Sequence, residues 1–381
     1  MKILIVAHNV SSGGAATACR RLIRAFECHQ GYQVLLLSVK EFNGLNKAIL
    51  KFHRIYCALL SKLDIYICKY LNNGSEHWQS SGLVGSLTAR RINRLNPNVV
   101  NVHWIGHATI SIRQLKKVNL PIIITMHDEW WVNAINHYEA KSEFHRKSSV
   151  RNRVISTILK QKMSFLSQPN VKIVSPSSEL RQKILNFLGG ANNQVYVIPN
   201  PISSRVFYPT REGKNNKNVL LYAGGTTDFR KGYDLLINAL NFMNEICEVL
   251  VLGTEGVETA GASNQITISG LPWVNSEDQM NRIYGESSMT LVPSRQEAFG
   301  QVASESLMAG TPVTSFEVGG LKDIVINRLN GYLIKGFDTA KMAEVLDDFL
   351  VRNHFDREDI SQDAKRRFSE QAVVQSYLSI L

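Results

Sequence analysis

The sequence has few cysteines and no cysteine pattern of a metal site or a disulfide framework. Its 381 residues include five cysteines, an odd number without C-x-x-C spacing: Cys19, Cys28, Cys57, Cys68 and Cys247. Scattered cysteines of this kind are typical of reduced thiols and argue against a zinc site. We therefore expect a cytoplasmic protein with free thiols.

Long apolar runs and a leader segment are also missing. No apolar run approaches the roughly 18 residues that a membrane-spanning helix needs. The N-terminal MKILIVAHN starts as a strand, without a basic lead or a cleavage site, so we expect no signal peptide. No internal repeat or low-complexity tract is present. With 44% hydrophobic residues, the chain is long enough for two domains with full cores.

Charge is distributed unevenly along the chain. Residues 1–190 hold 26 of the 43 Lys and Arg and 9 of the 32 Asp and Glu, a net charge of +17, and the remaining residues carry −6. Such asymmetry suggests an anionic partner for the first half, either nucleic acid or an anionic membrane surface. Because no nucleic-acid recognition motif accompanies the charge, we expect no nucleic-acid partner.

The segment 47–71 is predicted to be a long helix or a helical pair. Its basic residues fall on one side at about 100° per residue: Lys47, Lys51, Arg54, Lys62 and Lys69. Two interpretations remain open. Either this face rests on anionic lipid headgroups, with about 1 kcal/mol from each basic residue, or it is an ordinary solvated face. The first would make the protein peripheral on the inner face of the cytoplasmic membrane.

The stretch 289–316, MTLVPSRQEAFGQVASESLMAGTPVTSF, is predicted to form a βαβ unit. Apolar runs at 289–292 and 313–316 predict two buried strands, and a helix is expected from about Gln301 to Ala309. The loop before the helix contains Glu297, Phe299 and Gly300. In a parallel sheet this loop lies at the carboxyl edge, where ligands bind.

Glu297 and Glu305 are eight residues apart, one on the loop and one in the helix. Between them, the free amides at the helix start, around Gly300 to Val302, form an anion site. A ligand with hydroxyls at both ends and phosphates in the middle fits this layout, as a nucleotide sugar does. From spacing alone, two ordinary surface glutamates explain the pattern equally well.

The segment SRQEAFGQVASESLMAGTPVTSFEVGG resembles the signature of the retaining GT-B glycosyltransferases of family 4, the glycosyl transferases group 1 of bacterial polysaccharide and lipopolysaccharide type. The paired acids, the Phe-Gly, the helix and the Gly-x-Pro-Val occur together and in order, followed by Gly319-Gly320. The resemblance is dense in the second half of the chain and looser in the first.

The resemblance implies an α/β protein with the GT-B fold: two Rossmann-like, doubly wound domains facing a cleft, and a C-terminal helix that crosses back to the first domain. We place the basic, acceptor-binding domain at 1–190, the nucleotide-sugar domain at 191–365 and the returning helix at 366–381. Pro199-Asn200-Pro201, with Phe207 and Pro209 after it, resembles the family's interdomain linker.

The resemblance also implies a donor site. Glu305 would bind the ribose and Glu297 the transferred sugar, and the diphosphate would lie near Lys231. Glu297 and Lys231 are also the predicted catalytic residues of the nucleotide-sugar domain. The family's usual arginine is replaced by Gly225, so Arg230 is expected to supply the guanidinium. The other implied donor contacts are Gly14, Gly225, Leu271, Trp273, Phe299, Gly300 and Gln301. A tight turn at Gly14 and a solvated Lys231 remain the alternatives without a ligand.

In the first domain, polar residues follow the strands predicted at 99–103 and 121–126. The resemblance places His127 against the donor sugar, as the catalytic residue of this domain, although a histidine at a strand end is often structural. Acceptor contacts are predicted for His103, Trp104, Asp128, Glu129 and Trp130, with Trp131 beside them in an aromatic wall.

No cofactor or metal is expected. The histidines near these strands are His103, His107, His127 and His137. Their spacing matches no zinc pattern, and no D-x-D pair indicates Mg²⁺.

The implied reaction moves a sugar from a nucleoside-diphosphate sugar to an acceptor hydroxyl with retention. The acceptor is expected to be a lipid-linked oligosaccharide in bacterial O-antigen, capsule or exopolysaccharide synthesis. A nucleotide-sugar epimerase of the same fold and a non-catalytic nucleotide-sugar or membrane-binding scaffold are the alternatives.

Overall fold

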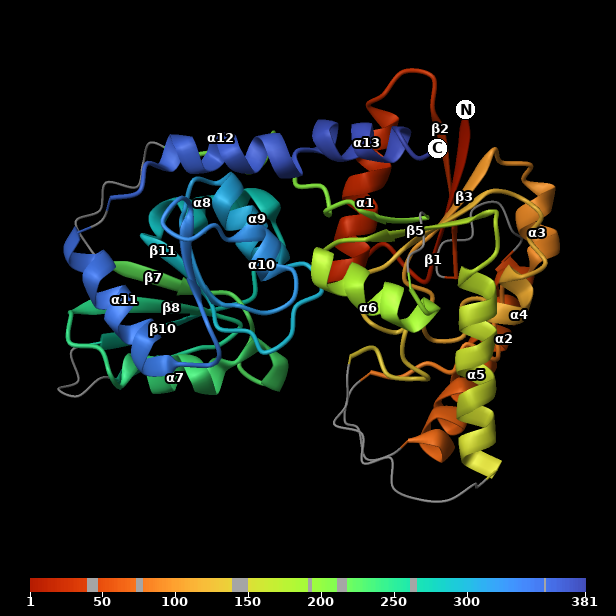
Figure 1. Ribbon diagram of the computed structural model, residues 1–381, viewed down its shortest axis with the longest axis horizontal. Helices are drawn as coiled ribbons and strands as arrows, with labels where there is room; N and C mark the ends of the chain where they lie inside the picture. The colour runs from red at the N-terminus through yellow and green to blue at the C-terminus, as the bar shows by residue number, and fades with distance from the viewer. Residues whose placement is uncertain are drawn as a thin grey trace. The chain divides into compact units, whose positions relative to one another are not determined.

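The computed structural model describes residues 1–39, 47–72, 78–138, 150–190, 194–210, 218–260, 266–352 and 354–381. The chain folds into two compact units. Unit 1 contains Met1–Ile198 and Val374–Leu381, and unit 2 contains Pro199–Val373. Each unit is built around one mainly parallel sheet with helices on its faces (Figure 1).

Unit 1 has a six-stranded parallel sheet in the order β2-β1-β3-β4-β5-β6. Its strands are β1 (Lys2–Ala7), β2 (Gln33–Ser38), β3 (Val99–Val102), β4 (Ile122–Thr125), β5 (Val171–Ser175) and β6 (Val195–Val197). Its helices are α1 (Gly14–Glu27), α2 (Lys47–Leu71), α3 (Ala89–Arg94), α4 (Ile112–Leu115), α5 (Val150–Leu166) and α6 (Ser178–Leu188). β3 and β4 are buried along their whole length, as is typical of strands covered on both faces.

Unit 2 has a seven-stranded sheet in the order β13-β12-β11-β7-β8-β10-β9. Its strands are β7 (Val219–Tyr222), β8 (Cys247–Leu252), β9 (Val257–Ala260), β10 (Ile266–Leu271), β11 (Met289–Val292), β12 (Val313–Phe316) and β13 (Gly331–Ile334). Its helices are the 3₁₀ turn η1 (Phe229–Lys231), α7 (Tyr233–Leu240), α8 (Glu277–Glu286), α9 (Gln301–Met308), α10 (Leu321–Ile324), α11 (Thr339–Arg352) and α12 (Arg357–Phe368). The edge strand β9 is antiparallel to β10 and was not predicted.

Both sheets are doubly wound. In each, the first strand has its successor on one side and a later strand on the other: β1 lies between β2 and β3, and β7 lies between β8 and β11. Such a switch point leaves a crevice at the carboxyl ends of the two diverging strands, where α/β proteins bind ligands. The predicted βαβ unit is confirmed as β11, α9 and β12, with β11 and β12 parallel.

The last helix, α13 (Glu370–Leu378), returns to unit 1 as predicted, because the chain from Val374 onward belongs to that unit. Figure 1 shows it in dark blue beside α1.

Candidate functional site

The switch point of unit 2 brings together two loops that the sequence analysis singled out. The segment 223–232 follows β7 and the segment 293–300 follows β11, and the two strands are paired neighbours. Their carboxyl ends meet at one edge of the sheet. Lys231 and Glu297, 66 residues apart in the chain, are therefore in contact.

Lys231 and Glu297 form an ion pair between Nζ and Oε1. Their side chains are 27% and 14% exposed. The hydroxyl of Ser294 also donates to the Glu297 carboxylate, at 3.3 Å. Because an ammonium has three N–H donors, Lys231 can hold Glu297 and an anionic ligand at the same time.

Two glycines hold the backbone of these loops where no other residue fits. Gly232, with φ +69°, ends the turn of Lys231, and a Cβ there would lie 2.0 Å from the Pro293 carbonyl oxygen. Gly319 has φ +50°, and its Cβ would lie 1.7 Å from the Glu297 carbonyl oxygen. These positions require glycine. Gly319, which follows the family signature in the sequence, therefore positions Glu297 by close backbone contact.

Helix α9 begins directly after Gly300, whose φ of +115° is favourable only for glycine. Its first residue is Gln301, so the amides of its first turn lie at the same sheet edge as Lys231. The Phe299 side chain is buried and packs edge-on against Phe368 at 6.0 Å. Phe299 can therefore meet a ligand through its backbone only.

Glu305 is the fifth residue of α9 and is partly exposed. Its Oε2 accepts a hydrogen bond of 3.1 Å from the hydroxyl of Tyr284, a fully buried residue of α8. This hydrogen bond fixes the position of the Glu305 carboxylate on α9.

Arg230 is paired within its own turn. Its guanidinium donates to both oxygens of Asp228, at 3.1 and 2.5 Å. Burial alone would raise the pKa of Asp228, but the hydrogen bond and charge of Arg230 lower it below its usual value. The guanidinium expected to bind a diphosphate is thus engaged by a neighbouring carboxylate.

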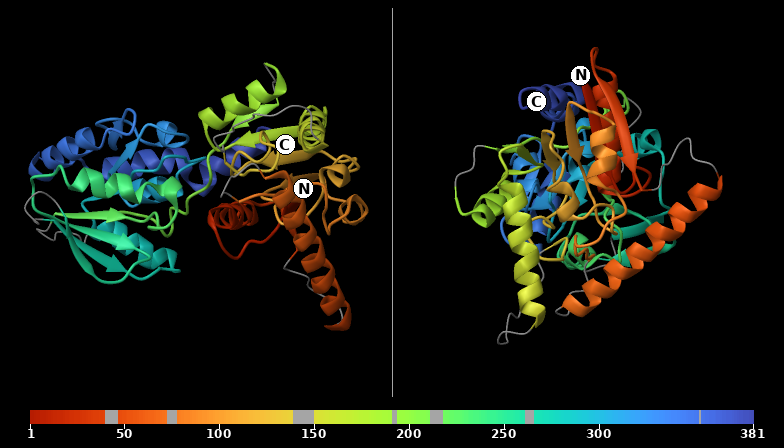
Figure 2. Two further views of the ribbon diagram at one scale, coloured as in Figure 1. Left: turned by 90° about the horizontal axis from the view of Figure 1, so that it is seen from below. Right: turned by 90° about the vertical axis from the view of Figure 1, so that its right-hand side faces the viewer.

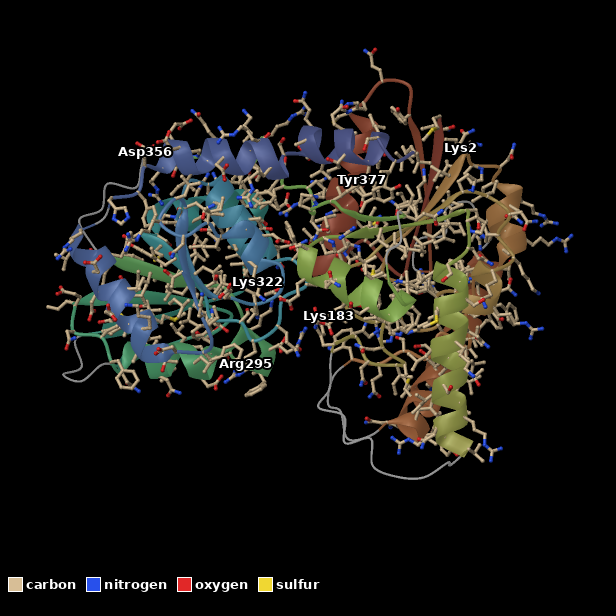
Figure 3. The ribbon with its side chains drawn as sticks, viewed as in Figure 1. Lys2, Lys183, Arg295, Lys322, Asp356 and Tyr377 are labelled. Atoms are coloured by element: carbon tan, nitrogen blue, oxygen red, sulfur yellow. The ribbon has the colours of Figure 1, made fainter. Side chains whose placement is uncertain are left out.

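Arg295, labelled in Figure 3, was not singled out by the sequence analysis and contacts the same turn. It donates to both oxygens of Asp234 at 2.7 and 2.5 Å and to the Phe229 carbonyl at 2.9 Å. Its guanidinium also lies 3.8 Å from the centre of the Phe229 ring. No motif identifies Arg295 because its partners come from another loop.

Trp273 lies against two glycines that follow β7 and β8. Its ring is close to the positions where Gly225 and Gly253 would carry a Cβ, at 3.4 and 2.4 Å. The Leu271 carbonyl accepts the amide of Gly253 at 2.7 Å. Because Trp273 is 63% exposed, it presents an aromatic surface beside Gly225. The structure therefore brings Gly225, Leu271 and Trp273 together.

In unit 1, Gly14 is the first residue of α1. The preceding Gly13 has φ +93° and no neighbour within 4 Å of a Cβ position. The side-chain oxygen of Asn9 accepts the amides of Ser11 and Ser12 at 3.2 and 3.3 Å. The Gly-Gly loop is thus a turn that opens at the carboxyl end of β1.

His103 and His127 follow the neighbouring strands β3 and β4 and contact each other. His103 Nδ1 and His127 Nε2 are 2.9 Å apart, and the rings stack at 5.1 Å. Burial lowers the pKa of His127 to about 4, against the opposing charge of Asp128, and lowers that of His103 well below its usual value. Both rings are therefore neutral near pH 7.

Asp128 is buried and fully engaged within unit 1. It accepts hydrogen bonds from the Trp130 amide at 2.9 Å, Trp104 Nε1 at 3.0 Å and His137 Nδ1 at 2.6 Å. Burial would raise the pKa of Asp128, but the charge and hydrogen bond of His137 lower it overall. These contacts hold the loop 128–137, and the acceptor contact of Asp128 stays a prediction.

Glu129 forms an ion pair of 2.7 Å with Lys183 of α6, labelled in Figure 3. Its side chain is 14% exposed.

The two tryptophans of the predicted aromatic wall are buried in unit 1. Trp130 and Trp131 are each only 3% exposed. Trp130 Nε1 donates to the Ser80 carbonyl at 2.7 Å, and Lys162 Nζ lies 3.5 Å from the centre of a Trp130 ring. Trp131 stacks on Phe165 at 5.7 Å. Both rings belong to the core.

Lys162 packs against Trp130 from α5. It is fully buried on α5. Its ammonium donates to the carbonyls of Trp130, Asn133 and Ala134, at 2.5, 2.8 and 3.1 Å. Burial lowers the pKa of Lys162 well below its usual value. The basic residues Lys141, Arg146 and Lys147 of the sequence lie outside the described residues.

A different aromatic cluster lies at the switch point of unit 1. His8 follows β1, and Trp104 and His107 follow β3; the Trp104 ring is 5.6 Å from that of His8 and 5.3 Å from that of His107. Trp78, 66% exposed, packs at 5.7 Å from His107. His8 could have been predicted as a polar residue at a strand end, whereas no local signal marks Trp78.

In the described parts of the chain, no group of three or more His, Cys, Asp or Glu is arranged to hold a metal ion. Among the same residues, no helix has both the length and the apolar character needed to cross a bilayer.

Two family models match adjacent parts of this chain. Glycosyltransferase Family 4 matches residues 12–205, and Glycosyl transferases group 1 matches residues 206–367.

Sequence relatives are about a quarter identical to the chain over the segments that align. The D-inositol 3-phosphate glycosyltransferase of Xylanimonas cellulosilytica is 27% identical over 201 residues, 47% of this chain and 48% of the relative. Glycogen synthase of Mycobacterium tuberculosis is 26% identical over 267 residues, 66% and 61% of the two chains. The chain thus spans about half the length of the first relative and less than two thirds of the second.

Solved structures resemble the chain over its full length. Sucrose-phosphate synthase from Thermosynechococcus elongatus has a TM-score of 0.67 at 16% identity, covering 100% of this chain and 98% of that one. Anabaena HepE, solved in complex with UDP-glucose, has a TM-score of 0.63 at 16% identity and covers both chains completely. Such low identity shows the fold alone, and that fold is the predicted GT-B fold.

Proposed function

This chain belongs to glycosyltransferase family 4, and on that premise we propose that it transfers a sugar from a nucleoside-diphosphate sugar to an acceptor hydroxyl with retention. The Lys231–Glu297 pair carries the proposal. At one sheet edge, this pair, Glu305 and the first amides of α9 supply a cation, two carboxylates and an anion site. This combination suits a ligand with hydroxyls on either side of a diphosphate.

Each group has a proposed role in donor binding. Lys231 and the α9 amides hold the diphosphate, and Glu305, held by Tyr284, binds the ribose. Glu297 binds the sugar, and the exposed ring of Trp273 stacks on the base. Because Arg230 is engaged by Asp228, we assign the main positive charge to Lys231. These groups stabilise the leaving diphosphate in place of a metal ion.

The proposed chemistry proceeds on one face of the sugar. The bond between the anomeric carbon and the diphosphate oxygen breaks, the acceptor oxygen bonds to that carbon, and the acceptor proton passes to the departing phosphate. Glu297 is not assigned as a nucleophile, because Lys231 and Ser294 already hold its carboxylate. His127, neutral near pH 7, is proposed to hydrogen-bond to the reacting sugar.

For the acceptor we propose a lipid-linked oligosaccharide of bacterial surface polysaccharide synthesis, met at an anionic membrane surface. The charge of +17 in residues 1–190 supports an anionic surface. The partly exposed cluster of His8, Trp78, Trp104 and His107 supports a saccharide acceptor, because aromatic faces suit sugar rings.

Thermal unfolding with a panel of nucleoside diphosphates, in the presence of a chelator, tests the donor site. A ligand at about 100 times its Kd stabilises the folded state by roughly 2.7 kcal/mol. We expect one diphosphate to raise the Tm of the wild type, and Glu305→Ala to lose most of that shift. Glu344→Ala, an exposed glutamate of α11, should keep it. If no nucleoside diphosphate raised the Tm of the wild type, the proposed donor site would be contradicted.

Turnover of the matching nucleotide sugar tests the chemistry. We expect transfer that a chelator leaves unchanged and a product with the anomeric configuration of the donor, read by NMR. An inverted product would contradict the retaining mechanism, and nucleotide binding without transfer would favour a scaffold.

A further inference from the structure

We propose that one exposed face of α2 is a docking surface for an anionic lipid bilayer. This face, the outer stripe, consists of Phe52, Tyr56, Leu59, Leu63, Tyr66 and Tyr70. These six side chains are between 47% and 75% exposed. The inference rests on the proposed function, because a lipid-linked acceptor is the reason why the protein approaches a membrane. It deepens that function by naming the surface that meets the membrane.

The outer stripe is continuous along the helix. Its residues are spaced alternately by four and three, which places them on one side of an α-helix. Figure 2 shows α2, in orange, as a long rod that extends from the body of unit 1. Six large apolar or aromatic side chains on one side of a rod form a patch far beyond the scattered exposed residues of an ordinary surface.

The stripe is not the packed face of the helix. A different face carries Asp64, Cys68 and Leu71, all buried. Cys68 and Leu71 join a core cluster with Ile155 and Ile158 of α5. The helix is therefore already anchored in unit 1 on one side, and the outer stripe remains in addition to that anchor.

Charge distinguishes a bilayer from a second copy of this chain as the occupant. Lys51, Lys62 and Lys69 are exposed and lie on one flank of the stripe, about 90° from its centre at 100° per residue. The acidic residue of α2, Asp64, is buried and bonded to Ser81. A helix that pairs with its own copy needs acidic residues opposite its lysines, and α2 exposes none. Anionic headgroups complement this flank.

The residue types also suit a bilayer surface. Tyr56, Tyr66 and Tyr70 combine an apolar ring with a hydroxyl, as is typical of side chains at the level of the headgroups. Lysines beside them can bury their stems while the ammonium stays at the phosphates. A helix of this kind lies in the membrane plane with its apolar face about 5–10 Å deep.

Co-sedimentation of the full chain with vesicles tests the surface. The vesicles are pure phosphatidylcholine or a mixture with phosphatidylglycerol, without any saccharide. We expect binding to the anionic vesicles, and the double variant Leu59→Gln/Leu63→Gln should lower the partition coefficient at least about tenfold. Phe242→Gln/Ile246→Gln, at two exposed apolar positions of unit 2, is the matched control and should bind as the wild type does.

A charge variant tests the basic flank separately. The partition coefficient should fall about fivefold for each lysine replaced in the variant Lys51→Gln/Lys62→Gln/Lys69→Gln. This variant should also lose the preference for phosphatidylglycerol. Wild-type partition in the Leu59/Leu63 variant would overturn the proposal. So would a wild-type dimer that this variant dissociates, because the stripe would then be covered by a second copy.

Nucleotide binding is measured in the same preparations without vesicles. Vesicle binding without a nucleoside-diphosphate shift would contradict the proposed function and leave the docking surface standing. A nucleotide shift without vesicle binding would overturn the docking surface alone.

Discussion

His103 and His127 share one hydrogen bond, and their surroundings indicate which ring donates it. His103 Nε2 is buried and has no partner among the described residues. A proton on that nitrogen would be an unsatisfied buried donor, which costs about 1–3 kcal/mol. We therefore expect the proton on His103 Nδ1, donated to His127 Nε2. The N–H of His127 is then on Nδ1, and ¹⁵N NMR of the two rings checks this tautomer.

The same pair predicts a pH dependence of stability. Because the pKa of His127 is lowered to about 4 in the native state, the unfolded chain binds a proton between about pH 6.5 and 4 that the native chain does not. Stability is therefore full above about pH 6.5 and falls as the pH drops toward 4. His127→Asn should remove up to about 3 kcal/mol of this loss, measured by urea unfolding at pH 7 and 4.

The exposed His354 provides the control, since His354→Asn should keep the wild-type pH profile. An unchanged profile in His127→Asn would contradict the neutral pair.

Gly319 and Gly189 provide a matched test of what glycine does at the candidate donor site. Both have positive φ, +50° at Gly319 and +85° at Gly189. A Cβ at position 319 would clash with the Glu297 carbonyl, whereas a Cβ at position 189 would have no neighbour within 4 Å. Gly189→Ala should cost about 1 kcal/mol of backbone strain, and nucleotide stabilisation should persist. Gly319→Ala should cost about 1–3 kcal/mol more and abolish that stabilisation, because it displaces Glu297. Thermal unfolding with and without nucleotide measures both; equal behaviour would refute the role of Gly319.

At the scale of elements, α5 holds the loop after β4 through one buried lysine. Lys162 is the donor that three carbonyls of residues 130–134 share. A methionine fills the same space but leaves those carbonyls unsatisfied. Lys162→Met should therefore lower the free energy of unfolding by about 3–5 kcal/mol, measured in urea.

Lys160 is on the same helix and exposed, so Lys160→Met should change stability by less than about 0.5 kcal/mol. Similar effects of the two substitutions would show that the Lys162 contacts contribute little.

At the scale of the whole molecule, the chain ends by returning to the unit in which it began. Tyr377 of α13 is 2% exposed, its hydroxyl is 3.0 Å from Thr125 Oγ1, and its ring packs edge-on against Phe26 at 5.9 Å. Figure 3 labels Tyr377 on α13. All these contacts are within unit 1, so the last helix completes the core of the first domain.

Tyr377→Ala should destabilise unit 1 by about 3–5 kcal/mol, as expected for a large buried side chain. Tyr377→Phe, which removes only the hydroxyl, should cost about 1 kcal/mol. Denaturant unfolding measures both. Nucleotide stabilisation should persist in each variant, because the candidate donor site belongs to unit 2; its loss in Tyr377→Ala would contradict that division.

The sequence by itself determined the GT-B fold, the βαβ unit of 289–316, and the long helix 47–71. Each depends on local information: apolar runs, Gly and Pro at the turns, and a motif whose residues are close in the chain. The contact of Lys231 with Glu297 could also be anticipated, since parallel neighbours end at the same sheet edge.

Only the tertiary structure decided which polar and aromatic residues are buried. Trp130 and Asp128 follow a strand, as ligand-binding residues do, yet Ser80 and Lys162, 50 and 32 residues from Trp130, draw that ring into the core. Conversely, the apolar residues of the outer stripe are exposed because α5 covers a different face of α2. Burial depends on partners that are distant in the chain, and no local pattern encodes which of these partners pack against a given side chain.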